Sequence, residues 1–206
     1  MSETLLLGTH NPGKIHEIKL ILGNVGWTLR SLRDFENVGV AEENADSYAG
    51  NAILKAQFYA RATGMMAPGA LALADDSGLE VEALGGAPGV LSARYAGEHA
   101  NDADRRELLL SELAKTESDN RRARFVCAVA IASATGEVLS VSEGICEGSI
   151  TFAARGSSGF GYDPLFVPDG YDQTFAELSD EVKNTISHRA RALIRLRHCL
   201  RKTPLR

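Results

Sequence analysis

The sequence of 206 residues contains little cysteine, few aromatic residues and no long hydrophobic run. Its three cysteines, Cys127, Cys146 and Cys199, are widely separated and form no C-x-x-C pair, which argues against a disulfide framework or a zinc site. No segment approaches the roughly 20 apolar residues of a membrane-spanning helix, and Glu3 lies where a secretory signal carries basic residues. We therefore expect a cytoplasmic protein that is not associated with a membrane.

Positive and negative charges are unevenly distributed along the chain. Residues 184–206 contain seven bases and no acid, whereas residues 1–183 contain 15 bases and 27 acids, so the net charge of −5 combines a basic end with an acidic remainder. A basic end is typical of a nucleic-acid-binding arm, but it also suits an anionic small-molecule substrate. Because the remainder is acidic and few aromatic residues are interspersed with the bases, we predict that the chain has no nucleic-acid partner.

The composition, with 44% hydrophobic and 24% charged residues, is that of a globular protein. Short apolar runs predict strands over residues 5–7, 27–32 and 71–74, and apolar residues at helical spacing predict helices that begin near residues 12, 47, 101 and 186. Residues 122–133 and 137–146 flank a short turn and predict an antiparallel hairpin, which interrupts strict strand–helix alternation. We therefore expect one domain over residues 1–206, of the α/β class with a mixed sheet.

The segment Gly8–Lys14 (GTHNPGK) lies between the first expected strand and the first expected helix. A helix N-terminus favours an anion, Thr9 and Asn11 can donate hydrogen bonds to phosphate oxygens, and Lys14 supplies a mobile positive charge. An ordinary turn in which Asn11 caps the helix is the alternative. The spacing also matches a P-loop, but Ile15 replaces the serine or threonine that a P-loop needs to hold magnesium.

Two pairs of acidic residues are candidate metal ligands. Asp75 and Asp76 follow an apolar run and precede a Ser-Gly turn, which predicts the end of a strand, where ligands bind in α/β sheets. Adjacent residues of an extended chain point to opposite sides, so one carboxylate can face a site while the other binds the scaffold. Glu42 and Glu43 add carboxylates from an acidic loop. Magnesium prefers such oxygen ligands, although solvated acidic turns are also common.

A glycine-serine loop offers a candidate base-binding residue. Phe160 lies between Gly159 and Gly161, so its ring has little local packing and can stack on a nucleobase, and Asp163 can accept hydrogen bonds from ring N–H groups. A tight turn with a core phenylalanine is the alternative interpretation.

The last candidate cluster is basic. Ser187 can cap a helix, which places His188 and Arg189 at the helix N-terminus, where bases are unfavourable unless an anion or a carbonyl lies opposite. Lys183 precedes them by one helical turn. A phosphate cradle, paired carboxylates, a stacking aromatic ring and these bases together indicate a nucleoside triphosphate site with Mg²⁺.

Seven segments in their order make the chain resemble the inosine triphosphate pyrophosphatase (Ham1-like) family, from Leu5 to about Leu196. The segments are Thr9–Lys14, Asn51–Ala56, Ala74–Leu79, Gly85–Gly89, Ser92–Tyr95, Gly159–Pro164 and Ser187–Arg189. The resemblance implies hydrolysis of inosine, deoxyinosine and xanthosine triphosphates to monophosphates and pyrophosphate, which cleanses the nucleotide pool. It also implies Mg²⁺, a homodimer, and an elongated mixed sheet flanked by helices, with two lobes and a central cleft.

The same resemblance implies roles for individual residues. It makes Asp76 the general base and a metal ligand, with Glu42 or Glu43 as the second acidic ligand, and it lets Lys55 reach phosphate. In the implied site, Phe160 stacks on the purine, and Lys183, His188 and Arg189 contact the base. The implied substrate-binding residues are Thr9, His10, Asn11, Pro12, Gly13, Lys14, Ser77, Phe160, Gly161, Tyr162, Asp163, Lys183, His188 and Arg189.

Hydrogen bonding explains how such a site selects its purine. Inosine and xanthosine carry a 6-carbonyl acceptor where adenine carries an amine, so donors such as Lys183 and Arg189 are satisfied by the first and left unpaired by the second. An unpaired buried donor costs about 1–3 kcal/mol, or roughly 10- to 100-fold in discrimination.

Other functions share these residues. A P-loop-like NTPase would release orthophosphate, a Maf-type pyrophosphatase would prefer modified or pyrimidine nucleotides, and a non-enzymatic protein would bind nucleotide or nucleic acid without cleavage. Separate measurement of orthophosphate and pyrophosphate over a panel of nucleotides distinguishes the enzymatic candidates.

Overall fold

The structure is a computed structural model that describes residues 4–23, 26–35, 38–64 and 69–202. Arg206, together with the side chains of Cys199, Arg201 and Lys202, lies outside the described part of the chain. Within the described residues, six strands form one sheet in the order β2-β1-β3-β4-β5-β6. The strands are β1 Thr4–Leu7, β2 Thr28–Ser31, β3 Leu71–Val81, β4 Arg122–Ser133, β5 Val138–Ile150 and β6 Phe166–Pro168.

The sheet is mixed, as the interrupted strand–helix alternation predicts. Strand β1 pairs in parallel with β2 and with β3, whereas β5 and β6 are antiparallel. Strands β4 and β5 are neighbours joined by a tight turn, in which Ser133 N donates to Glu137 O at 2.9 Å. So short a connection forces an antiparallel pair, which confirms the predicted hairpin.

The chain divides into two compact units, and β3, β4 and β5 each contribute residues to both. Unit 1 contains residues 1–76, 127–144 and 189–206, and unit 2 contains residues 77–126 and 145–188. The helices of unit 1 are α1 Pro12–Leu22, α2 Tyr48–Gly64 and, apart from its first residue, α5 His188–Lys202. The longer helices of unit 2 are α3 Asp102–Lys115 and α4 Asp180–Ile186.

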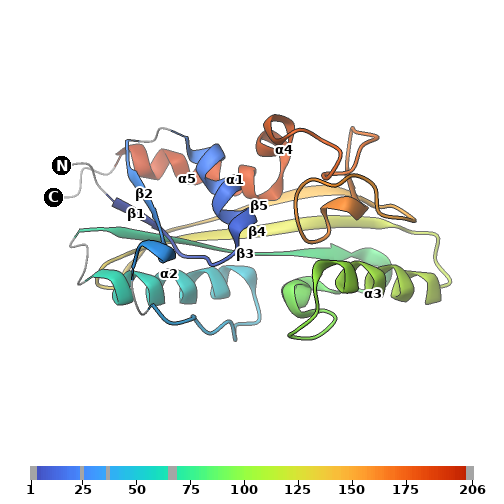
Figure 1. The fold of residues 1–206 in the computed structure, drawn as a ribbon, viewed down its shortest axis with the longest axis horizontal. Coiled ribbons are helices and arrows are strands. Elements are labelled where there is room, and N and C mark those ends of the chain that lie inside the picture. The colour runs from blue at the N-terminus through green and yellow to red at the C-terminus, as the bar shows by residue number, and fades with distance from the viewer. Residues whose placement is uncertain (1–3, 24–25, 36–37, 65–68, 203–206) are drawn as a thin grey trace. The chain divides into compact units, whose positions relative to one another are not determined.

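In unit 1, α1 and α5 cover one face of the sheet and α2 covers the other (Figure 1). The α1 and α5 face is filled by large aliphatic side chains, among them Leu5, Leu73, Ile18 and Leu193. Alternate residues of the strands point to the α2 face, where Ala72, Ala52 and Ala56 are fully buried and allow the helix to lie close to the strands. The two faces of β3 therefore meet different helices, and this arrangement separates its two aspartates.

Unit 2 has its own core, built from Leu79 and Val81 of β3, the α3 residues Leu109 and Leu113, and a cluster of aromatic rings. The rings of Phe125, Phe166 and Phe175 lie in contact, with centroids 4.8–6.0 Å apart. Helix α3 begins near residue 101, as predicted: Asn101 caps it by accepting from Ala103 N at 2.8 Å, and Asp104 completes a capping box.

Other local predictions are also confirmed. Helix α1 begins at Pro12, as predicted, and is followed by its C-cap Gly23, which adopts φ +54°. The helix predicted to begin near residue 186 begins at His188, since α4 ends at Ile186, and its buried face carries Ala190, Leu193, Leu196 and Leu200. Among the described residues, no helix is long and apolar enough to cross a membrane.

Candidate active site

Asp75 and Asp76 lie in the middle of β3, which runs unbroken from Leu71 to Val81. The prediction that the strand ends before these aspartates is therefore wrong. Two adjacent acids followed by Ser-Gly have the composition of a turn, but basic side chains on both faces of the strand neutralise them. Asp75 is 1% exposed and Asp76 is 5% exposed. Their carboxylates point to opposite faces of the sheet, as the alternation of an extended chain predicts.

On the α1 and α5 face, the carboxylate of Asp75 is held by two bases. Its Oδ2 accepts from Arg189 Nε at 3.2 Å and Arg189 Nη2 at 3.0 Å, and it pairs with Lys14 Nζ at 3.1 Å. The Nη1 atom of Arg189 donates to Glu17 Oε2 of α1. Burial of Asp75 opposes its ionisation, but Lys14 and Arg189 outweigh this effect and hold the pKa of Asp75 well below its usual range.

Arg189 is therefore a structural cross-link between β3, α1 and α5. Its side chain is 1% exposed, and all three guanidinium nitrogen atoms donate to carboxylates, Nε and Nη2 to Asp75 and Nη1 to Glu17. A basic residue at the start of this helix needs an anion opposite, as its position in the sequence predicts. Carboxylates of the protein itself supply this anion, so the geometry does not support the predicted contact of Arg189 with the nucleobase of the substrate.

On the α2 face, Asp76 lies in a second, different cluster. Its Oδ1 accepts from Lys55 Nζ at 2.8 Å and its Oδ2 accepts from Asn51 Nδ2 at 3.2 Å. The ammonium of Lys55 also pairs with Glu43 Oε1 at 3.3 Å, and Asn51 Oδ1 accepts from Ala45 N at 2.9 Å, which ties the acidic loop to α2.

The pKa values in this cluster shift for identifiable reasons. Burial raises the pKa of the Asp76 carboxyl; Lys55 opposes the rise without cancelling it, and Glu43 adds to it. Burial disfavours the charged form of Lys55, but Asp76, Asp75 and Glu43 outweigh burial and raise its pKa. Asp76 is thus a buried carboxylate with a raised pKa beside a firmly protonated lysine, an arrangement that suits a general base.

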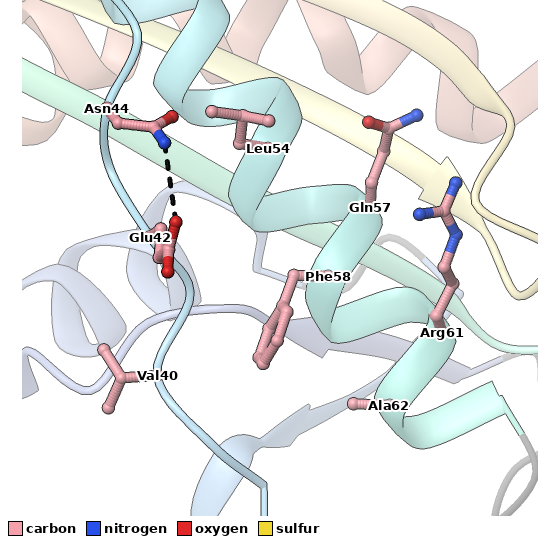
Figure 2. A pocket seen from close by; sticks show the side chains of 8 residues that line it. All are labelled: Val40, Glu42, Asn44, Leu54, Gln57, Phe58, Arg61 and Ala62. Carbon is pink, nitrogen blue, oxygen red and sulfur yellow. Dashed lines mark hydrogen bonds between the residues drawn. The ribbon is translucent and has the colours of Figure 1, made fainter.

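The structure distinguishes the two glutamates of the acidic loop. Glu43 contacts Lys55, whereas Glu42 Oε2 accepts from Asn44 Nδ2 at 3.4 Å and lines a separate pocket of about 630 Å³ (Figure 2). That pocket is bordered by α2 residues including Phe58, which points toward the loop in Figure 2. Glu43 is therefore the better candidate for the second metal ligand.

The donor set fits a divalent cation, although no cluster of three acidic, histidine or cysteine side chains occurs in the part of the chain that the structure describes. Asp76 and Glu43 both face the ammonium of Lys55, so a positive charge already lies between the two carboxylates. Magnesium is commonly held by one or two carboxylates together with substrate phosphates. Two protein carboxylates are therefore a sufficient set when phosphate supplies the other oxygens.

The loop before α1 contains the predicted helix cap, whereas its binding of phosphate stays a prediction. Asn11 caps the helix, because its Oδ1 accepts from Gly13 N at 2.8 Å and Lys14 N at 3.2 Å. Thr9 Oγ1 accepts from Asn11 N at 3.2 Å. Since Pro12 has no N–H and the next two are used by the cap, the side chains of the loop, not its helix-terminal N–H groups, are the groups available to phosphate. Lys14 is the charged member of this set, and its side chain is 15% exposed.

In unit 2, Phe160, Asp163 and Lys183 come together. Lys183 Nζ donates to Asp163 Oδ2 at 2.5 Å and lies 5.2 Å from the centre of the Phe160 ring. The same oxygen accepts from Phe160 N at 2.9 Å. Gly159 is required here: it adopts φ +75°, and a Cβ at this position would lie 2.2 Å from Asp163 Oδ2.

Three other predicted site residues of unit 2 have different surroundings. Tyr162 is buried, donates from its hydroxyl to Ser92 O at 3.0 Å, and has its pKa raised by burial. His188 is buried with its ring stacked on Phe125, 4.6 Å between centroids. Ser77 follows Asp76 in β3 and is half-buried. The structure thus gives Tyr162 and His188 packing roles; their predicted contacts with substrate stay predictions.

Sequence reasoning from residue types missed Glu17 and assigned no role to Asn51. Glu17 lies in α1 directly before the buried residue Ile18, and this position is its only sequence signal. Its partner Arg189 lies 172 residues away, so the pair becomes visible only in the fold.

The chain is similar to known proteins over nearly its whole length. A model of the Ham1 family matches residues 5–199. The chain is 45% identical over 196 residues to a protein of Exiguobacterium sibiricum named dITP/XTP pyrophosphatase, covering 95% of this chain and 96% of that one. It is 46% identical over 191 residues to a Bacillus subtilis protein of the same name, covering 93% of each chain.

Solved structures give the same result. A HAM1 protein from Coxiella burnetii superposes with a TM-score of 0.86 at 37% identity, covering 98% of this chain and 100% of the other. The Ham1 protein of Staphylococcus aureus superposes with a TM-score of 0.81, also at 37% identity, covering 96% and 98% of the two chains. These likenesses confirm the expected mixed α/β fold.

Proposed function

Because this chain belongs to the Ham1 family, we propose that it hydrolyses the non-standard purine nucleoside triphosphates ITP, dITP and XTP to monophosphates and pyrophosphate. The names of the relatives support this activity. The structural observation that carries the proposal is the buried carboxyl of Asp76, whose pKa is raised. It shares the ammonium of Lys55 with Glu43.

The triphosphate is bound by side chains of unit 1. Thr9, His10, Asn11 and Lys14 border the start of α1, and Lys14 exchanges its contact with Asp75 for a phosphate oxygen. Asp75 stays compensated after this exchange because Arg189 continues to bind it. A lysine suits this role, since its ammonium is a point charge on a flexible stem.

Asp76 is the general base that takes a proton from the attacking water. The water oxygen forms a bond to the α-phosphorus, the bond from that phosphorus to the bridging oxygen breaks, and pyrophosphate leaves with the bridging oxygen. Each Asp76 oxygen has a second lone pair beside its bond to Lys55 or Asn51. Asp76 and Glu43 would hold Mg²⁺, which when bound neutralises charge that develops on the phosphate oxygens.

The base is recognised by residues of unit 2. Phe160 stacks on the purine, and the ammonium of Lys183, oriented by Asp163, donates to the 6-carbonyl. An adenine amine in the same place leaves one N–H of this buried ammonium without an acceptor while Asp163 binds another, which costs about 1–3 kcal/mol. Lys183, not Arg189, therefore carries the discrimination against ATP.

The protein acts as a homodimer in the cytoplasm. Half-exposed apolar side chains on α2, Leu54 and Phe58, provide surface for a partner subunit. The described cysteines Cys127 and Cys146 are free thiols, which suits a reducing compartment. Light scattering with size-exclusion chromatography tests the dimer, and cell fractionation tests the compartment.

One experiment separates the proposed reaction from its competitors. The protein is incubated with ITP, XTP, GTP, ATP, CTP or UTP and Mg²⁺, and orthophosphate and pyrophosphate are measured separately. We expect pyrophosphate from ITP and XTP at rates at least about tenfold above those with ATP. Orthophosphate with a diphosphate product, or a preference for pyrimidine nucleotides, contradicts the proposal.

A further inference from the structure

Both polar backbone groups of Gly161, next to Phe160, are bound by side chains of α3. Gly161 N donates to Asp102 Oδ2 at 2.7 Å, and Gly161 O accepts from Arg106 Nη1 at 2.7 Å. Gly161 adopts φ +59°, a conformation that side-chain-bearing residues rarely adopt. Charged side chains thus hold one peptide segment of an irregular loop on both sides, with hydrogen bonds of the stronger, charge-assisted kind.

Asp102 is itself held in place. Its Oδ1 accepts from Arg105 Nη1 at 2.6 Å, and Arg105 Nη2 donates to Ala100 O at 2.5 Å. Asp102 is not needed to cap α3, because Asn101 and Asp104 already form the capping box. The cap of α3 is therefore complete without the Asp102 carboxylate. Beyond α3 and its cap, this carboxylate binds Gly161 N.

The loop that contains Phe160 consequently has two independent attachments. Asp163 accepts from Phe160 N at 2.9 Å and binds Lys183 at 2.5 Å, which fixes the loop next to the lysine. Asp102 and Arg106, which both belong to α3, fix the next residue, Gly161. Together these contacts determine where the Phe160 ring stands relative to Lys183.

We propose that Asp102 and Arg106 are positioning residues for base recognition: through the two backbone groups of Gly161 they hold Phe160 at the place where it stacks on the purine. The inference rests on the proposed function, because it concerns the same base-binding residues. A misplacement of about 1 Å in a positioning group can lower a rate or an affinity substantially. Asp102 and Arg106 contact Gly161 within unit 2, whereas the proposed phosphate-binding residues belong to unit 1. Their loss therefore weakens base binding and leaves the phosphate chemistry intact.

The test compares ligands with and without a base. Asp102→Ala and Arg106→Gln each remove one attachment, Asp102→Asn keeps an acceptor oxygen for Gly161 N, and Glu107→Gln changes an exposed residue of the same helix as a control. Inhibition constants are measured for inosine monophosphate and for inorganic tripolyphosphate, alongside kcat and KM for ITP and the midpoint of thermal unfolding.

We expect Asp102→Ala and Arg106→Gln to raise KM for ITP and the inhibition constant of inosine monophosphate by about tenfold. The inhibition constant of tripolyphosphate and kcat should stay within about twofold of the unsubstituted protein. Asp102→Asn should recover most of the affinity, and Glu107→Gln should change nothing. In the double variant the two effects should be less than multiplicative, because both act through Gly161.

Equal weakening of both ligands would mean that the substitutions damage the protein generally, and unchanged affinity for inosine monophosphate would mean that the contacts do not position the ring; either result overturns the inference. Failure of the unsubstituted protein to release pyrophosphate from ITP removes the proposed function instead. Calorimetric binding of inosine monophosphate without Mg²⁺ still measures the positioning effect in that case, because it requires no turnover.

Discussion

Asp75 and Asp76 are neighbours in β3, yet their carboxylates have partners of different kinds. Asp75 pairs with the ammonium of Lys14 and is also bound by the planar guanidinium of Arg189, which is shared with Glu17 and is almost completely buried. Asp76 shares the single ammonium of Lys55 with Glu43, whose side chain is 36% exposed. A guanidinium binds carboxylates in a fixed geometry, whereas an ammonium is a flexible point charge. The first face is therefore suited to holding elements together, and the second to exchanging one cation for another.

The largest expected effect is on kcat and comes from a substitution of Asp76, on the α2 face of β3. Asp76→Asn removes the proposed general base but keeps an oxygen for Lys55, so we expect kcat to fall by roughly 10²- to 10⁴-fold with little change in thermal unfolding. Asp46→Asn, an exposed acid of the neighbouring loop, is the control. Near-normal turnover by Asp76→Asn would remove this residue from the mechanism.

Substitutions on the α1 and α5 face of β3 should lower the free energy of unfolding. Arg189→Met leaves Asp75 and Glu17 buried without their shared base, and Glu17→Gln is the milder change, so we expect losses of up to about 3–5 kcal/mol in the free energy of unfolding. Urea unfolding measures the loss, with the exposed Arg191→Met as control. Under conditions where Arg189→Met is folded, its preference for ITP over ATP should be unchanged. A selective loss of that preference would restore Arg189 to the base site.

The two glutamates of the acidic loop give a smaller, sharper contrast. Glu43→Gln removes one of the two carboxylates around the Lys55 ammonium, and we expect the Mg²⁺ concentration for half-maximal rate to rise by about tenfold, equivalent to about 1.4 kcal/mol. Glu42→Gln, in the separate pocket of Figure 2, should leave it unchanged. Equal effects of the two substitutions would contradict the assignment of Glu43.

The smallest expected effect concerns the buried, uncharged hydroxyl of Tyr162. Its effect on stability is a reference for the effects of the charged groups on the two faces of β3. Burial raises the pKa of Tyr162 above its unfolded value, so its contribution to stability is complete below about pH 10, the ordinary tyrosine pKa, and is lost as pH rises beyond it. Tyr162→Phe loses the hydrogen bond to Ser92 O, at a cost of about 1 kcal/mol.

The measurement is the free energy of unfolding between pH 7 and pH 11. The unsubstituted protein should lose stability more steeply than Tyr162→Phe above pH 10, and the two curves should converge. Parallel curves over this range would show that Tyr162 does not titrate differently in the folded state.

Local sequence signals predicted most elements of the fold. The caps of α1 and α3 have residue types that hydrogen-bond backbone N–H groups, and the hairpin and helices have regular apolar periods. The prediction failed within β3, because charges in the middle of a strand are tolerated only when bases distant in sequence neutralise them. Lys14, Lys55 and Arg189 come from three different helices, and no local pattern announces that they meet.

The candidate site was predicted in the same uneven way. Asp76, Lys14, Phe160, Asp163 and Lys183 were all named from the sequence, and the structure brings the last three into contact. For Arg189, the residue pattern requires an anion nearby without revealing whether a ligand or the protein supplies it, and in the structure Asp75 and Glu17 supply it. Asp102 gave no signal beyond that of an acid at a helix start.

The sequence by itself determined the residue types of a nucleotide-hydrolysing site, the family, and the opposite orientation of Asp75 and Asp76, because strand alternation needs no tertiary information. Only the tertiary structure decided that Asp75 meets Arg189 together with Lys14, whereas Asp76 meets Lys55. That choice depends on which helix covers each face of β3, and it separates a carboxylate that holds the scaffold from one that can act on substrate.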